Sequence, residues 1–366
     1  MRVPLAVAGE APRGFVDEFG YLHFDGGWRV EWWVGGDDHW HVPAAAASRR
    51  QRVVGNTPVV ETVMRVPGGD VVWRAAAVAS AQGGAVVVEF ENAATIPVAI
   101  GIALITPDTV VAPASRPALH FTAPARAVAA EFGVELLVHP VSHAATWRCS
   151  IGPTQPNELP HLDAVVRGWQ ALARQGASIS TGDPSFDDAL AVARTSLLLH
   201  AGRLTTPRDR LVAGAVATAL TLLGHEDEAE ALRVRARLRP KRRGLPIVAD
   251  IAPAVTTEPL ALLDDPVAAA AVVAAARAAL VGDARRRVVE VLPGARDSWR
   301  GHSIDVANLP TNSGEVSFAL RWHGEHPALL WETPAPRRRG QRITVRAPAL
   351  KPDWSTTDPT GETLLR

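Results

Sequence analysis

A chain of 366 residues is long enough for two or three domains with a sizeable buried core. Its 38 basic and 38 acidic side chains cancel, so no overall field favours nucleic acid or an anionic membrane. The single cysteine, Cys149, excludes an intramolecular disulfide, and no apolar run reaches the roughly 18 residues of a membrane span. The short N-terminal apolar run is interrupted by Pro4 and is not typical of a secretory signal, so we expect a cytoplasmic protein.

The first 158 residues carry the patterns of β-strands. Trp28, Val30, Trp32 and Val34 alternate with residues of the opposite face, which predicts a half-buried strand. Further β-branched runs lie at 59–66, 70–78, 85–91 and 97–105, some of them separated by glycine pairs typical of turns. The stretch 128–138 predicts either a strand pair or a strand with a short helix. Short strands at this spacing indicate an N-terminal antiparallel β-sandwich over residues 1–158.

Residues 159–287 carry helical periodicity instead. Leu162, Val165, Val166 and Trp169 recur on one helical face, and Asp183 before Pro184 is an N-cap pattern. Helices are predicted over about 162–172, 183–202, 208–223, 226–239 and 265–282. The connection 239–259 is rich in proline and basic residues, and we expect it to be irregular. This segment is therefore predicted to be a short helical domain.

The last segment, residues 288–366, returns to β patterns. Alternation over 316–322 predicts a strand, followed by a turn at 323–327, a second strand at 328–332, a solvated loop at 334–341 and a strand at 342–346. We therefore predict a multidomain α+β fold with an N-terminal antiparallel β-sandwich, a short helical domain and a C-terminal β-domain.

Tryptophan is concentrated in two places that also hold carboxylates and histidines. Four of the 11 tryptophans lie between residues 28 and 40, and two more lie between residues 321 and 332. Flat indole faces beside polar groups are typical of a saccharide-binding surface. The candidate binding residues are Trp33, Asp37, Asp38, His39, His41, Arg321, His323 and Glu332. The C-terminal group is a candidate wall of a cleft against the Trp28–Trp40 segment.

Each of these candidates also has a structural interpretation. A second layer over its strand face would make Trp33 a core residue. Asp37 and Asp38 follow a glycine pair and fit a polar turn. Arg321, His323 and Glu332 fit a polar strand face with a hairpin tip. His39 and His41 would point to the same side of a strand, but no third ligand is evident, so we predict neither a metal nor another cofactor.

Catalytic residues are not assigned. Glycoside hydrolysis needs two carboxyls facing each other at about 5–9.5 Å. Asp37 and Asp38 are neighbours that would point to opposite sides of a strand, although a loop would let both turn. The acidic residues at 226–230 and 264–265 fit helix N-termini, where they complement the helix dipole. Turnover is therefore less expected than binding.

Three parts of the chain resemble a known protein group. These are the stretches 31–43, 224–229 and 317–332, the last accompanied by 354–357. Together with the order of the segments, they resemble an uncharacterised actinobacterial group of six-hairpin glycosidase-like proteins, of the glucoamylase and glycoside phosphorylase kind. The resemblance implies carbohydrate chemistry and a helical toroid. Twelve helices need on the order of 250 residues, whereas about 125 are present, so we expect a shortened helical domain with the loss in 239–259.

These observations predict a carbohydrate-associated protein that binds a saccharide, with catalysis doubtful. The alternative is a non-catalytic scaffold or partner subunit of a full-length glycosidase-like paralogue, in which a homo-oligomer or the paralogue covers exposed apolar area. A third hypothesis is a hydrolase that uses Asp37 or Asp38.

Overall fold

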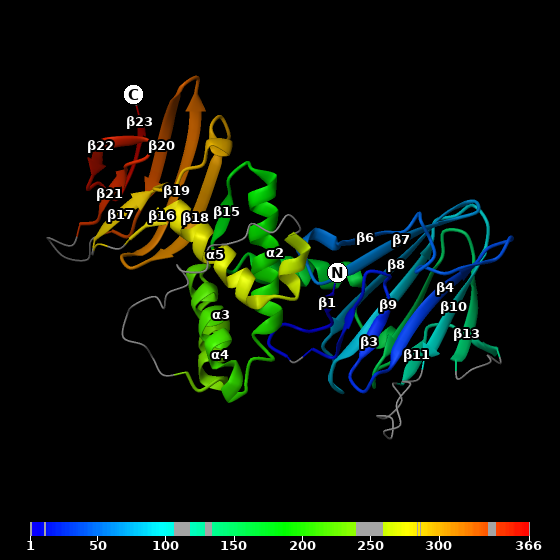
Figure 1. Ribbon diagram of the computed structural model, residues 1–366. Coiled ribbons are helices and arrows are strands. Elements are labelled where there is room, and N and C mark those ends of the chain that lie inside the picture. The colour runs from blue at the N-terminus through cyan, green and yellow to red at the C-terminus, as the bar shows by residue number, and fades with distance from the viewer. Residues whose placement is uncertain are drawn as a thin grey trace. The chain divides into compact units, whose positions relative to one another are not determined.

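The computed structural model describes residues 2–10, 12–105, 118–128, 134–238, 259–283, 285, 287–335 and 342–365. The chain divides into two compact units, Met1–Gln170 (unit 1) and Ala171–Arg366 (unit 2), and most of their elements are labelled in Figure 1. Antiparallel sheets in both units, together with five described α-helices, confirm the multidomain α+β fold class. The three domains 1–158, 159–287 and 288–366 stay a prediction.

Unit 1 contains two large antiparallel sheets. The first has the order β1-β2-β3-β4-β10-β13-β12, with β5 paired to β4. Its strands are β1 Val3–Pro4, β2 Gly14–Val16, β3 Leu22–Phe24, β4 Arg29–Gly35, β5 Trp40–His41, β10 Val98–Ile105, β12 Arg126–Val128 and β13 Val134–Val141. The second has the order β11-β14-β9-β8-β7-β6. Its strands are β6 Arg50–Val53, β7 Val60–Val66, β8 Gly69–Val78, β9 Ala85–Asn92, β11 Leu119–Phe121 and β14 Thr146–Ile151.

The two sheets of unit 1 face each other across an aromatic core. Trp32 of β4 stacks on Trp73 of β8 with ring centroids 5.9 Å apart, and its edge meets Phe90 of β9. Trp28 and Trp32 are 7% and 2% exposed, which confirms them as core residues. Between 126 and 141 the described residues form the strand pair β12–β13, so the alternative with a short helix was wrong for them.

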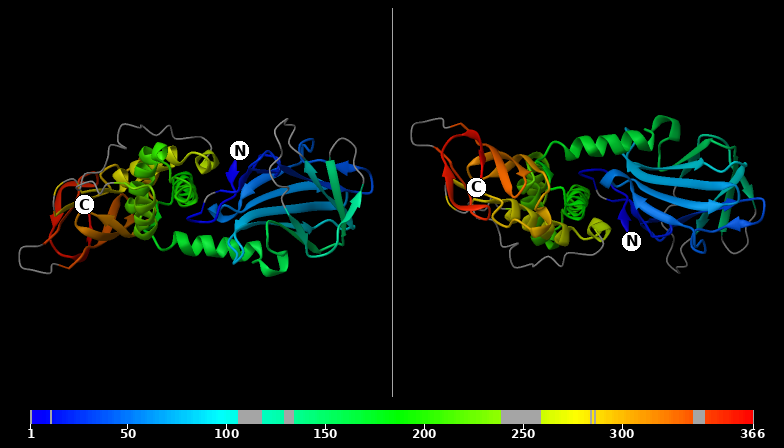
Figure 2. Two further views of the ribbon diagram at one scale, coloured as in Figure 1. Left: turned by 90° about the horizontal axis from the view of Figure 1, so that it is seen from below. Right: turned by 90° about the horizontal axis from the view of Figure 1, so that it is seen from above.

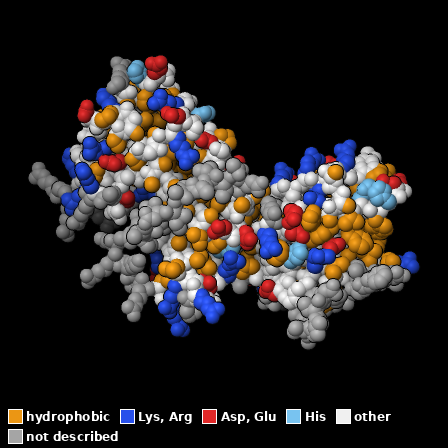
Figure 3. Space-filling model, in the orientation of Figure 1, with side chains coloured by type: hydrophobic (Ala, Val, Ile, Leu, Met, Phe, Trp, Pro, Cys, Tyr) orange, Lys and Arg blue, Asp and Glu red, His pale blue; other side chains and the backbone are white. Residues whose placement is uncertain are grey.

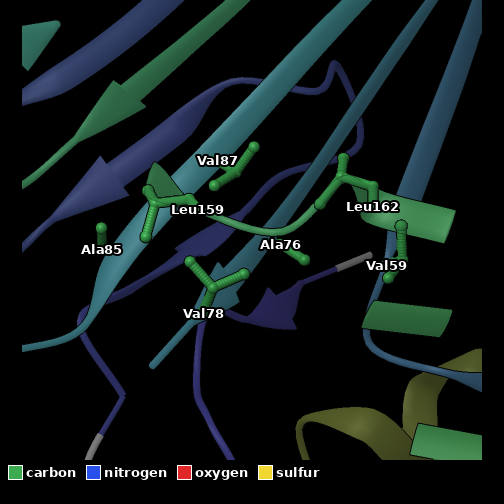
Figure 4. Packing of buried hydrophobic residues seen from close by; sticks show 7 residues of the cluster. All are labelled: Val59, Ala76, Val78, Ala85, Val87, Leu159 and Leu162. Atoms are coloured by element: carbon green, nitrogen blue, oxygen red, sulfur yellow. The ribbon is translucent and has the colours of Figure 1, made fainter. Parts of the chain in front are cut away.

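Helix α1, Leu162–Ala173, covers part of the outer face of the six-stranded sheet. Figure 4 shows the second, smaller core between them, in which Leu159 and Leu162 meet side chains of the sheet. The sheet residues of this core are Val59, Ala76, Val78, Ala85 and Val87. The backbone N–H of Leu162 donates to Glu89 Oε1, so a carboxylate from the sheet holds the first turn of α1.

The other helices belong to unit 2 and stand together on one side of its strands in both views of Figure 2. They are α2 Pro184–His200, α3 Arg210–Leu222, α4 Glu226–Arg235 and α5 Pro266–Leu280. The side chains of Asp183 and Asp265 accept hydrogen bonds from the first backbone N–H groups of α2 and α5. This confirms the predicted caps, because a carboxylate at the N-cap satisfies N–H groups that no helical carbonyl reaches. No described helix is long and apolar enough to cross a membrane.

Unit 2 also holds a five-stranded sheet with the order β15-β18-β19-β20-β23 and a four-stranded sheet with the order β16-β17-β21-β22. The strands are β15 Ser178–Ser180, β16 Val281–Gly282, β17 Val288–Val291, β18 Ile304–Thr311, β19 Gly314–His323, β20 His326–Glu332, β21 Thr344–Ala347, β22 Lys351–Thr356 and β23 Thr360–Leu364. The last predicted strand therefore begins two residues later than expected. The predicted irregular connection 239–259, except its last residue, and most of the loop 334–341 lie outside the described residues.

Candidate functional site

The hairpin of β4 and β5 carries most of the candidate residues of unit 1. Gly35 lies opposite Trp40 and Val34 opposite His41, and the backbone N–H of Gly36 donates to the carbonyl of His39 at 3.1 Å. This contact closes a four-residue turn, 36–39. Glycine and aspartate favour such turns because they allow backbone conformations and local hydrogen bonds that strand-forming residues disfavour.

Trp40 lies on the outer face of the eight-stranded sheet. Its ring meets that of Trp33 edge to face, with centroids 6.5 Å apart. A Cβ on Gly35 would lie 3.3 Å from two Trp40 ring atoms, and one on Gly101 of β10 would lie 3.1 Å from the same ring. The two glycines form a floor under the indole, and their φ angles lie outside the left-handed region. Trp40 is 41% exposed, so part of the side chain faces solvent.

The surface around this tryptophan pair is apolar. By register, Leu136 and Val138 of β13 and Val128 of β12 share the outer face with Gly101. Val128 is 44% exposed, and the other two are half-buried. Figure 3 shows hydrophobic side chains gathered over β4, β10 and β13 in unit 1. We name this surface, with Trp33 and Trp40, the Trp40 face.

A polar pair adjoins Trp33 on β4. Arg29 Nη2 lies 2.6 Å from Glu31 Oε1, and Trp33 Nε1 donates to Glu31 Oε2 at 3.4 Å. Both oxygens of this largely buried carboxylate therefore have partners. The contact orients the Trp33 indole and leaves Glu31 poorly placed to act on a substrate.

Asp38, His39 and His41 form a second group at the turn. Asp38 Oδ2 lies 3.0 Å from His39 Nδ1, and Asp38 Oδ1 lies 2.9 Å from His41 Nε2. Desolvation raises the pKa of Asp38, but the hydrogen bonds from His41 and from the backbone N–H of His39 together outweigh it, and the pKa lies below its ordinary value. The carboxylate is therefore charged near neutral pH.

The two groups lie on opposite sides of the hairpin. A Cβ on Gly35 would meet the Trp40 ring, whereas one on the next residue, Gly36, would meet Asp38 Oδ1 and His41 Nε2. Successive residues of an extended chain point to opposite sides, which explains this separation. Asp37 is exposed on the connecting turn. The predicted strip from Trp33 to His41 thus consists of two surfaces.

The candidate residues of unit 2 lie on one face of the five-stranded sheet but far apart along it. Glu332 is opposite Ser317, and His323 is six residues from Ser317 along β19, which corresponds to roughly 20 Å. Arg321 Nη2 lies 2.5 Å from Asp305 Oδ1, and Arg321 Nη1 donates to the carbonyls of Ile304 and Leu320 at 3.0 Å. Arg321 is therefore engaged within its own sheet. These three residues do not form a compact cluster, and their role in binding stays a prediction.

Three features of the site were missed in the sequence. They are the exposed ring of Trp40, its glycine floor, and the return of Asp38 to the two histidines. One local signal pointed to these features: the pair Gly35-Gly36 is followed closely by Trp40 and by a His-x-His pattern. Gly101 could not be recognised, because it is brought to Trp40 by the pairing of β10 with β4.

Comparison with known proteins finds no matching family model and no matching curated protein. Among solved structures, the chain is similar to a bacterial glucoamylase complexed with acarbose, with a TM-score of 0.40 and 7% sequence identity. The match covers 64% of this chain and 50% of the glucoamylase chain. The chain thus spans about half the length of that protein. A likeness this distant assigns neither a family nor a site, and the resemblance to six-hairpin glycosidases stays a prediction.

Proposed function

We propose that unit 1 binds a saccharide on the Trp40 face, with the indoles of Trp40 and Trp33 as the platform. The observation that carries this proposal is the position of Trp40. Its ring rests on Gly35 and Gly101, and it is 41% exposed to solvent. Large aromatic side chains are usually withdrawn from water, so a fixed and exposed indole on an apolar surface favours a binding role.

The chemistry of a sugar ring suits this surface. A pyranose presents C–H groups on one face, and the negative face of an aromatic π-system attracts such weakly positive groups. The glycine floor and the edge contact with Trp33 restrict the Trp40 ring before a ligand arrives. Less conformational entropy is then lost on binding.

Polar groups beside the platform would orient the sugar hydroxyls. The Arg29 side chain is 42% exposed and is held by Glu31 next to Trp33. Asp37 is exposed on the adjoining turn. The proposal does not use Asp38, His39 or His41, because they lie on the other side of the hairpin. It also does not depend on Arg321, His323 or Glu332 of unit 2.

The proposed activity is binding without turnover. Glu31, the carboxylate nearest to Trp33 along its strand face, has both oxygens engaged by Arg29 and Trp33. The hydrolase hypothesis with Asp37 makes a distinct claim: the protein would release sugar from an oligosaccharide, and Asp37→Asn would abolish that release.

The test is a titration of the full chain with a panel of oligosaccharides that includes α-glucans. Tryptophan fluorescence and calorimetry detect the binding. Trp40→Ala should weaken binding roughly 30-fold, as the loss of a central aromatic contact worth about 2 kcal/mol does. Val128→Ala is the matched control, since it removes exposed apolar surface from the same face without touching the platform. Its affinity should stay close to that of the wild type.

Two results would overturn the proposal. One is the absence of binding to every member of the panel. The other is equal weakening by Trp40→Ala and Val128→Ala, which would indicate a general apolar surface. Light scattering on the same variants tests the scaffold alternative: an oligomer that Trp40→Ala converts to a monomer, without saccharide binding, would assign the Trp40 face to a second copy.

A further inference from the structure

The turn between β4 and β5 brings three metal-ligand side chains together. One ligand atom each from Asp38, His39 and His41 lies within 4.8 Å of the others. The two closest approaches join the carboxylate to the rings, at 3.0 Å for His39 Nδ1 and 2.9 Å for His41 Nε2. The imidazole rings lie 4.1 Å apart, centroid to centroid. The nitrogens that approach the carboxylate therefore converge on one small region.

The backbone holds these groups in place before any ligand is present. The N–H of His39 donates to Asp38 Oδ1 at 2.8 Å, which restrains the carboxylate. His41 belongs to β5, where pairing with Val34 restrains its backbone. Its side chain is the least exposed of the three. All three residues lie within four positions of one turn, so binding requires no distant segment to move.

Gly36 leaves the convergent region open. A Cβ at this position would lie 2.8 Å from Asp38 Oδ1, 3.4 Å from His41 Nε2 and 3.4 Å from Pro67 Cδ. The φ angle of Gly36 is outside the left-handed region, so its backbone conformation does not demand glycine. Glycine matters here because the absence of a side chain leaves space beside Asp38 Oδ1 and His41 Nε2.

We propose that this turn binds a divalent transition metal ion of the Zn²⁺ class through the Asp38 carboxylate, His39 Nδ1 and His41 Nε2. Two imidazoles and a carboxylate are ligands that Zn²⁺ accepts, and water completes the coordination of a three-ligand site. Ca²⁺ and Mg²⁺ prefer oxygen ligands, so they should not replace it. Each imidazole would coordinate the metal ion through a ring nitrogen that carries no proton, as the neutral tautomer whose N–H lies on the other ring nitrogen.

A zinc-sized ion requires only small side-chain adjustments. Zn–N and Zn–O distances of about 2.0–2.2 Å place tetrahedral ligand atoms roughly 3.2–3.6 Å apart. The carboxylate–imidazole distances of 2.9 and 3.0 Å lie slightly below this range, and no pair of ligand atoms exceeds 4.8 Å. This inference is independent of the proposed saccharide binding, because the residues lie on the opposite side of the hairpin from the Trp40 ring.

The test uses the untagged full chain, freed of metal with a chelator and titrated calorimetrically with ZnCl₂. We expect saturation at one Zn²⁺ per chain and no heat of binding with CaCl₂ or MgCl₂. Asp38→Ala and His41→Gln should each weaken Zn²⁺ binding more than tenfold. Gly36→Ala should weaken it too, because it keeps all three ligands and fills the space between them. Absorption of bound Co²⁺ gives a second readout of coordination in each variant.

His23→Gln is the matched control. His23 Nε2 lies 2.8 Å from Asp17 Oδ2, a similar histidine–carboxylate contact in the same unit but outside the turn. This variant should bind Zn²⁺ like the wild type. The proposal is overturned by the absence of stoichiometric Zn²⁺ binding. It is equally overturned if Asp38→Ala and His41→Gln, folded by circular dichroism, bind Zn²⁺ as tightly as His23→Gln.

Discussion

The two sheets of unit 1 share one core but have very different outer faces. On the six-stranded sheet, a row of alternating charges crosses five neighbouring strands, and helix α1 covers an apolar area beside it. On the eight-stranded sheet, the outer face carries the exposed tryptophan pair and apolar side chains. One outer face is thus closed by partners within unit 1, whereas the Trp40 face exposes apolar side chains.

The charged row follows directly from strand register. Arg52, Glu61, Arg74, Glu89 and Arg148 lie opposite one another in β6, β7, β8, β9 and β14. Glu61 accepts from Arg52 Nε at 2.7 Å and from Arg74 Nε at 2.8 Å, and Arg148 Nε lies 3.0 Å from Glu89. Directly opposed charges of opposite sign stabilise a sheet. On the Trp40 face, by contrast, β10 carries glycine and alanine instead of charged residues, and these small residues leave room for an aromatic ring.

The contrast teaches that burial alone does not identify a functional surface. Glu61 and Glu89 are buried carboxylates, yet their partners are arginines of the sheet and, for Glu89, His161 and the backbone N–H of Leu162 at the start of α1. Trp40 is a large apolar side chain, and the described part of unit 1 leaves it 41% exposed. The exposure of Trp40 is therefore more informative about binding than the burial of the two glutamates. Four substitutions test this comparison.

The largest effect is expected at the closed face. Leu162→Ala removes a fully buried side chain from the core between α1 and the six-stranded sheet and should destabilise unit 1 by about 2–5 kcal/mol. Urea unfolding followed by tryptophan fluorescence measures the change. A loss below about 1 kcal/mol would show that α1 does not seal this face.

The next effect is expected within the charged row. Glu61→Gln removes the buried carboxylate that accepts from Arg74 Nε, whereas the 3.5 Å contact of Arg74 Nη1 with Asp163 Oδ1 remains. The change should cost about 1.5–3 kcal/mol, the range for a hydrogen bond to a charged group. Unfolding at neutral pH measures it. Arg52→Gln is the control, because Arg52 is mostly exposed and its removal leaves the Glu61–Arg74 contact intact, so its effect should be smaller.

The same glutamate predicts a pH dependence. Burial raises the pKa of Glu61, but hydrogen bonds from Arg52 and Arg74 outweigh it, and the pKa lies below the ordinary 4.5. The folded state therefore binds fewer protons than the unfolded state around that pH, and the contribution of Glu61 is complete above 4.5 and lost as the pH falls. The stability difference between wild type and Glu61→Gln should shrink on acidification. A difference that stays constant would contradict this pKa direction.

Trp40→Ala should have a smaller effect on stability than Leu162→Ala, about 1–2 kcal/mol, because its ring is partly in water already. Its effect on saccharide affinity should be the larger consequence. Measuring both in one variant separates the two roles. A loss of stability as large as that of Leu162→Ala would indicate that Trp40 is mainly a core residue.

The smallest effect is expected for Val128→Thr on the edge strand β12. The two side chains have the same shape, and Val128 is 44% exposed, so stability should change by less than about 0.5 kcal/mol. Light scattering should give the same mass for both proteins. A change of oligomeric state would show instead that the Trp40 face is buried by another copy.

Local patterns in the sequence predicted the described α-helices, several of the strands and part of the core, but not strands such as β2, β14 and β18. Alternation along β4 placed Trp28 and Trp32 inside, and Asp183 and Asp265 capped the predicted helices. Such features depend on near neighbours, since strand alternation repeats every two residues and a cap reaches backbone groups two or three residues away. The same local patterns placed Trp33 on the face opposite to Trp32, which the structure agrees with.

The charged row and the Trp40 face depended on contacts that no local pattern contains. Register between strands as far apart as residues 52 and 148 aligned the charged row, and the pairing of β10 with β4 placed Gly101 under Trp40. The contacts of Asp38 with His39 and His41, by contrast, join near neighbours within one turn. The sequence by itself determined which residues face inward and where helices begin. Tertiary structure decided which outward side chains meet, because strand pairing joins residues that are distant in the chain and shifts every partner together.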